Sequence, residues 1–97
     1  MKISPENIQQ IANYFEKKPV LKAYLFGSTV KGKSSEESDI DILVELDYSK
    51  RIGLQFIQMK IDLEKMLQKK VDLVSANGIS PFIKPSVEKE KQLVYAR

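Results

Sequence analysis

Residues 39–46, with the sequence DIDILVEL, constrain the fold more than any other part of the chain. Apolar residues recur there at every second position, which is the period of a β-strand with one buried face. The residues predicted to face the core are Ile40, Ile42, Val44 and Leu46. Those predicted to face the other way are Asp39, Asp41, Leu43 and Glu45. The pattern therefore predicts a strand that carries two carboxylates at the start of its second face.

The other predicted elements alternate between helical and extended patterns. Ser4 and Pro5 are typical of a helix N-terminus, and the helix that they start is expected to end before Pro19. Helices are also predicted for residues 51–68 and 85–95, and strands for residues 20–26 and 69–75. The order α-β-β-α-β-α predicts an α/β (α+β) fold, in which a small mixed β-sheet of about three strands has helices packed on one face.

The helix predicted for residues 51–68 has a wide apolar face, and we expect that face to pack on the sheet. Its apolar residues include Leu54, Ile57, Ile61, Leu63 and Leu67. In the last helix, Val87 and Val94 are expected to point inward.

Composition limits the chemistry that the chain can perform. Its 97 residues are expected to form one domain, residues 1–97, with an open ledge rather than a cleft between two lobes. The absence of cysteine and histidine excludes thiolate metal sites and Ser-His-Asp catalysis, and carboxylates alone favour hard cations such as Mg²⁺. No apolar window approaches the length of a membrane span, which predicts a cytoplasmic protein without a membrane partner. The net charge of +3 is spread among acids, so no direct contact with nucleic acid is expected.

The loop after the first predicted strand has the composition of a phosphate-binding turn. Gly27 and Ser28 open it, and Lys31 and Lys33 flank Gly32. Glycine lets backbone amides approach a phosphate closely, a serine hydroxyl donates to it, and lysines offset its charge. An ordinary turn has a similar composition, so the loop alone does not decide the function.

Two carboxylates follow this loop and offer ligands for a metal ion. Asp39 and Asp41 are two positions apart on a strand, so their Cβ atoms are about 6 to 7 Å apart on one side, close enough to hold a divalent cation between them. Without a cation they would repel each other. A solvated strand face is the alternative interpretation. Together, the loop and the carboxylates predict a site for a metal ion and a nucleoside triphosphate.

The composite motif GSTVKGKSSEESDIDILVE resembles the signature of the DNA polymerase beta-like nucleotidyltransferases, and the whole chain resembles their minimal branch, the MNT proteins. The resemblance implies the polymerase beta-like nucleotidyltransferase core. It also implies that two Mg²⁺ ions are bound by Asp39, Asp41 and a third acid, which matches Asp72 in KVDLV. The nucleotide-binding residues that it implies are Gly27, Ser28, Lys31 and Ser38. Lys31 replaces the arginine that many relatives carry, and it therefore lacks their two-pronged contact with phosphate.

This resemblance also implies a reaction and a partner. MNT proteins of toxin–antitoxin pairs transfer AMP from ATP to a tyrosine of a HEPN ribonuclease toxin, and we expect the same of this chain. One alternative is a non-catalytic antitoxin that neutralises a HEPN partner by occlusion. Transfer to a small molecule such as an aminoglycoside is a third interpretation, but enzymes of that kind carry an extra domain for the acceptor.

Overall fold

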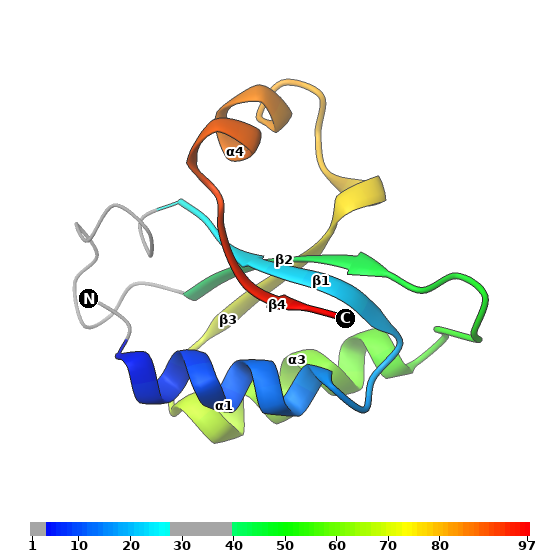
Figure 1. Cartoon of the computed structure of the whole chain (residues 1–97). Helices are drawn as coiled ribbons and strands as arrows, with labels where there is room; N and C mark the ends of the chain where they lie inside the picture. Colours follow the sequence, from blue (N-terminus) through cyan, green and yellow to red (C-terminus); the bar gives the residue numbers. More distant parts are fainter. Residues whose placement is uncertain (1–3, 28–39) are drawn as a thin grey trace.

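The computed structural model describes residues 4–27 and 40–97, shown in Figure 1. Its helices are α1 (Pro5–Phe15), α3 (Gln55–Leu67) and α4 (Lys84–Glu90), and a short 3₁₀ turn, η1, spans Ala76–Gly78. Its strands are β1 (Val20–Leu25), β2 (Ile40–Leu46), β3 (Val71–Ser75) and β4 (Gln92–Ala96). None of the helices in these two ranges has the length and apolar character needed to cross a membrane.

The strands form one mixed sheet in the order β3-β2-β1-β4. β1 runs antiparallel to both β2 and β4, whereas β2 and β3 are parallel. Helices α1 and α3 lie on one face of this sheet and α4 on the other (Figure 1). The mixed α+β fold is thus confirmed, but the described residues form a sheet of four strands rather than about three, and their helices are not all on one face.

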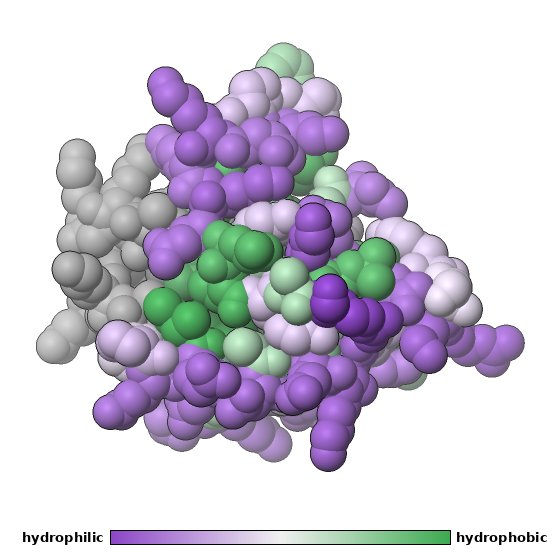
Figure 2. Space-filling view, in the orientation of Figure 1, coloured by the Kyte–Doolittle hydropathy of each residue, from purple (hydrophilic) through white to green (hydrophobic). Residues whose placement is uncertain are grey.

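The fourth strand replaces the second half of a predicted helix. The helix expected for residues 85–95 ends at Glu90, Lys91 is already extended, and Gln92–Ala96 pairs with β1. Val94 and Tyr95 suit a strand, and the edge of β1 offers them backbone hydrogen bonds that a helix end would not. In Figure 2, hydrophobic side chains gather over β4, between the largely hydrophilic surfaces of α4 and α1.

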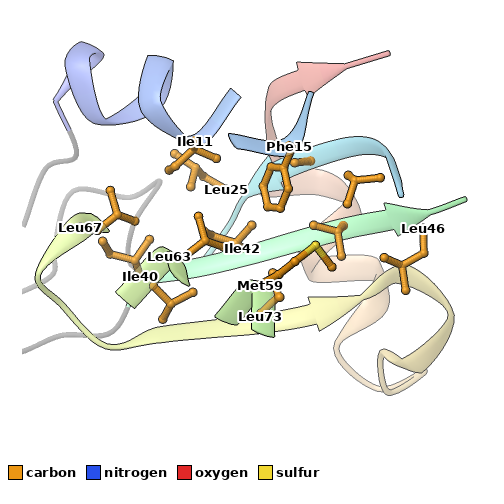
Figure 3. Packing of buried hydrophobic residues seen from close by; sticks show 14 residues of the cluster. Ile11, Phe15, Leu25, Ile40, Ile42, Leu46, Met59, Leu63, Leu67 and Leu73 are labelled. Carbon is orange, nitrogen blue, oxygen red and sulfur yellow. The ribbon is translucent and has the colours of Figure 1, made fainter. Parts of the chain in front are cut away.

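The main core lies between the sheet and the pair α1 and α3. Ser4 caps α1 by accepting the Asn7 N–H, and the helix buries Ile11 and Phe15. Figure 3 shows these two side chains near those of the sheet and of α3. The predicted alternation of β2 is confirmed, because the core includes Ile40, Ile42, Val44 and Leu46.

Helix α3 is rotated differently from the expectation. Leu63 and Leu67 are buried as predicted, but Leu54, Ile57 and Ile61 are 81%, 56% and 40% exposed. The prediction was wrong for these three residues because the helix is apolar on two faces. The core side is filled by Met59, Leu63 and Leu67, with Phe56 and Met66 packed against them.

A second, smaller cluster covers part of the opposite face. Tyr24 and Phe26 from the β1 region, Leu43 of β2 and Val87 of α4 pack together there. The expected inward position of Val87 is therefore confirmed, with α4 lying over the face to which Leu43 and the carboxylate of Asp41 belong.

Candidate active site

Asp41 and Asp72 are direct neighbours across the parallel strands β2 and β3, where their Cα atoms are register partners. The residues on either side of each aspartate, such as Ile42 and Leu73, are buried in the main core. Because side chains alternate along a strand, both carboxylates point to the opposite face. Parallel strands lie about 4.8 Å apart, so the two side chains emerge close together. Asp72 is exposed and Asp41 is half-buried, as expected for a ledge that is open to solvent.

Gly27 places the start of the loop directly against this ledge. Its φ of +64° is in the left-handed region, where a residue with a side chain is strained. A Cβ atom added to it would lie 2.5 Å from Oδ2 of Asp41. The adjacent Phe26 N–H donates to the Asp41 carbonyl oxygen at 3.2 Å, which holds the two segments together. Only glycine therefore lets the backbone come this close to the carboxylate.

A polar network lies farther along the same face. The Tyr24 hydroxyl donates to Glu45 Oε2 at 2.9 Å, and Lys91 Nζ lies 4.2 Å from the centre of the Tyr24 ring. Lys91 also forms an ion pair of 2.8 Å with Glu88 of α4. Burial, followed by the hydrogen bond to Glu45, raises the pKa of Tyr24. These contacts connect α4 to the central strands, and the raised pKa means that the folded protein favours the neutral form of Tyr24.

Sequence reasoning missed the position of Lys91. It placed this lysine inside the last helix, whereas the structure brings it beside Tyr24, about 67 positions away along the chain. Glu45 could have been anticipated, because the alternation of β2 puts it on the same face as Asp41.

The structure brings together three of the seven predicted site residues, namely Gly27, Asp41 and Asp72. Ser28, Lys31, Ser38 and Asp39 lie outside the described residues. Within the described part of the chain, no group of three acidic residues is close enough to hold a metal ion. The described half of the site is thus a pair of carboxylates beside a glycine turn.

Carboxylate oxygens are the ligands that Mg²⁺ prefers, and Mg²⁺ commonly takes only one or two of them and completes its shell with water and phosphate oxygens. Asp41 and Asp72 fit that requirement, because they are adjacent carboxylates, of which Asp72 is exposed and Asp41 half-buried. The glycine turn adds a place where a phosphate can approach the backbone. The arrangement is therefore suited to holding a metal-bound nucleotide on an open surface.

Comparison with known proteins agrees with this chemistry. The family model described as polymerase beta, nucleotidyltransferase matches residues 9–97. A Methanocaldococcus jannaschii protein, provisionally named a protein adenylyltransferase, is 39% identical over 71 residues, which are 73% of this chain and 75% of the relative.

Two solved structures share the fold. The chain resembles a toxin–antitoxin crystal structure with AMP-PNP, with a TM-score of 0.75 and 22% identity over 98% of this chain and 75% of that chain. It also resembles a structure of the tri-AMPylated Shewanella oneidensis HEPN toxin in complex with an MNT antitoxin, with a TM-score of 0.63 and 22% identity over 93% of this chain and 73% of that chain. The family match, which covers nearly the whole sequence, shows that the chain belongs to the polymerase beta nucleotidyltransferases, in agreement with the motif that joins Gly27 to Asp41.

Proposed function

We propose that this chain is an Mg²⁺-dependent protein adenylyltransferase that transfers AMP from ATP to a tyrosine hydroxyl of a HEPN-type toxin and so acts as its antitoxin. The observation that carries the proposal is the pairing of Asp41 with Asp72 across parallel strands, beside the glycine turn at Gly27. The other proposed site residues are Asp39, Ser28, Lys31 and Ser38.

The metal-binding role falls to the acidic residues. Asp39, Asp41 and Asp72 would hold two Mg²⁺ ions, which supply charge neutralisation at the triphosphate and lower the pKa of a bound hydroxyl. Asp41 and Asp72 have the required adjacency. The exposure of Asp72 leaves room for the phosphate oxygens and waters that complete an Mg²⁺ shell.

The remaining residues position the nucleotide. Backbone amides at Gly27 and Ser28 and the Ser28 and Ser38 hydroxyls would donate to the triphosphate, while Lys31 offsets its charge. The tyrosine oxygen forms a bond to the α-phosphorus, and the bond from that phosphorus to the bridging oxygen of the β-phosphate breaks, so that pyrophosphate leaves. The phenolic proton passes to a carboxylate, for which Asp72 is the proposed acceptor because it is exposed on the ledge.

The proposed acceptor and partner rest on the relatives. One curated relative is provisionally named a protein adenylyltransferase, and one structural neighbour is a complex of an AMPylated HEPN toxin with an MNT antitoxin. An open ledge suits such an acceptor, since a tyrosine on a folded protein cannot enter a closed pocket.

The test is to incubate the purified chain with ATP, Mg²⁺ and the HEPN-type protein that we expect to be encoded beside it. Intact-mass spectrometry should show addition of AMP units to that protein, and peptide mapping should place them on tyrosine. Asp41→Asn and Asp72→Asn should each abolish the adduct, because each removes a metal ligand. Glu6→Gln is the matched control, since Glu6 is an exposed acid at the start of α1, on the other face of the sheet.

The occlusion alternative gives a different result. Full neutralisation of the toxin without any adduct, and equally good neutralisation by Asp41→Asn, would refute the adenylyltransferase proposal in favour of occlusion.

A further inference from the structure

Helix α3 carries a second apolar surface that the core does not use. Leu54, at its N-cap, Ile57 and Ile61 are 81%, 56% and 40% exposed. Their spacing of three and four residues aligns them along one side of the helix. We call these three residues the α3 stripe. Large aliphatic side chains that are aligned on one exposed helix face are a feature of binding surfaces.

The rotation of α3 is fixed, so the stripe cannot turn inward. On one flank, the Tyr14 hydroxyl of α1 donates to Asp62. On the other flank, the Val71 N–H donates to Glu64 Oε2 at 3.0 Å. Between these flanks Leu63 is fully buried. Turning the stripe toward the sheet would break both hydrogen bonds and expose Leu63.

The surroundings of the stripe are basic. Arg51 lies in the segment just before the helix and Lys65 follows Ile61 by one turn, and both are exposed. The two acids of α3 are the flanking residues Asp62 and Glu64, which already accept the hydrogen bonds described above. The outward side of the helix therefore combines an apolar centre with positive ends.

A shallow hollow of about 650 Å³ adjoins the stripe at Ile61. Its lining residues are Ile61, Glu64, Lys65, Gln68, Lys69 and Lys70. Lys65 and Lys70 are exposed there, and the Glu64 carboxylate accepts a hydrogen bond from the Val71 N–H. The hollow is therefore suited to an acidic side chain of a partner.

This charge pattern argues against a second copy of the same chain. If two α3 helices packed antiparallel through their stripes, Lys65 of each would approach Arg51 of the other. If they packed parallel, like charges would again face each other. Like charges brought together in an interface disfavour that pairing, so the complementary surface belongs to a different molecule.

We infer that the α3 stripe and the lysine-lined hollow form a docking surface for a partner protein whose matching patch is apolar in the middle and acidic at its edge. The identification of that partner as the HEPN-type toxin rests on the proposed function. The stripe lies across the sheet from Asp41 and Asp72, because α3 covers the core face. Docking there leaves the ledge open to ATP and to the acceptor hydroxyl, so partner binding and AMP transfer use different surfaces of the chain.

The test measures affinity for the HEPN-type partner by calorimetry, using the double variant Ile57→Gln/Ile61→Gln. Both side chains are exposed, so the variant should keep its fold, which circular dichroism and thermal unfolding would check. We expect affinity to fall by about tenfold or more, since buried apolar anchors dominate interfaces. Binding of Mg²⁺-ATP should not change. Lys65→Glu should also weaken the complex, and added salt should weaken the wild-type complex more than the Lys65→Glu complex.

The chain offers two matched controls. Phe82 is 93% exposed in the segment before α4. Leu93 is 52% exposed on β4, the strand over which hydrophobic side chains gather in Figure 2. Phe82→Gln and Leu93→Gln should leave the affinity unchanged. Unchanged affinity in the α3 double variant, or an equal loss in a control variant, would overturn the inference.

A membrane surface is the competing occupant, because apolar and basic residues also suit anionic lipids. Sedimentation with phosphatidylserine vesicles tests it: lipid binding that the α3 double variant loses while it keeps its partner affinity would refute protein docking.

The readouts also separate this inference from the proposed function. Partner binding through α3 without AMP transfer would refute only the proposed function, whereas transfer with no effect of the α3 variant would refute only this inference.

Discussion

Replacing Gly27 with alanine should damage the site while leaving the fold nearly intact. The new Cβ would lie 2.5 Å from Oδ2 of Asp41, whereas ordinary van der Waals contact begins at 3.4 Å. The carboxylate oxygen must therefore move by about 0.9 Å. The atom belongs to a side chain and not to the backbone, so rotation of the Asp41 side chain can relieve the contact without moving the strand. A displacement of about 1 Å in a catalytic group can lower the rate about 10²-fold, which is the loss of AMP transfer that we expect.

The backbone contribution can be separated by a matched variant. Gly53 also has a positive φ, of +46°, but an added Cβ there has no neighbour within 4 Å. Each substitution should cost about 1 kcal/mol through the left-handed conformation, which in a domain of this size lowers Tm by about 4 to 8 °C. Gly53→Ala should therefore match Gly27→Ala in thermal unfolding but keep wild-type transfer and wild-type affinity for Mg²⁺-ATP.

The assay compares the two variants side by side, by scanning calorimetry for stability and by the initial rate of AMP incorporation for function. If Gly27→Ala transfers AMP as fast as Gly53→Ala, the close approach of the loop to Asp41 does not matter for the reaction, and the reasoning from this contact is refuted.

Three further predictions follow from other parts of the structure. Asp72→Asn should leave the free energy of unfolding unchanged or slightly higher, because it relieves repulsion with its register partner Asp41. Denaturant titration would contradict this if it showed a loss above about 1 kcal/mol. Leu63→Ala should lower the free energy of unfolding by about 2 to 5 kcal/mol, because truncating this fully buried side chain leaves a cavity between α3 and the sheet. Ile61→Ala, at an exposed position of the same helix, is the control in the same titration. The raised pKa of Tyr24 means that the neutral phenol is favoured in the folded state, so its contribution to stability is complete below its usual pKa of 10 and is lost as the pH rises toward the folded value. Tyr24→Phe should therefore show a smaller loss of stability between neutral and strongly alkaline pH than the wild type, and equal losses would contradict this assignment.

The sequence predicts the central strand well, because one local rule decides it. The period of two in residues 39–46 assigns Ile40 and Ile42 to the core and Asp41 to the other face, and the register of β2 agrees. The proximity of Asp72 to Asp41 depends on which strands pair and in which register, and periodicity alone does not contain that information. The family resemblance supplied it instead.

The errors in the last predicted helix and in the packing of α3 both arise because tertiary contacts override local sequence preference. Residues 92–96 have a sequence that suits either a helix end or a strand, and pairing with β1 decides for the strand. In α3, apolar residues occur on two sides, so periodicity cannot say which side packs inward. Contacts with Tyr14 and Val71, both outside the helix, fix its rotation.

Helix α4 is only weakly packed on the sheet, and this determines which part of the protein unfolds locally. This helix has seven residues, of which only Val87 is buried, whereas β1 and β2 are paired with strands on both sides. Amide protons of α4 should therefore exchange with deuterium through local openings far smaller than global unfolding, while those of β1 and β2 exchange only when the whole sheet opens. Because Asp41 lies on β2, its carboxylate is carried by the slowest-exchanging part of the molecule. Opening of α4 therefore leaves in place the strand that carries this carboxylate.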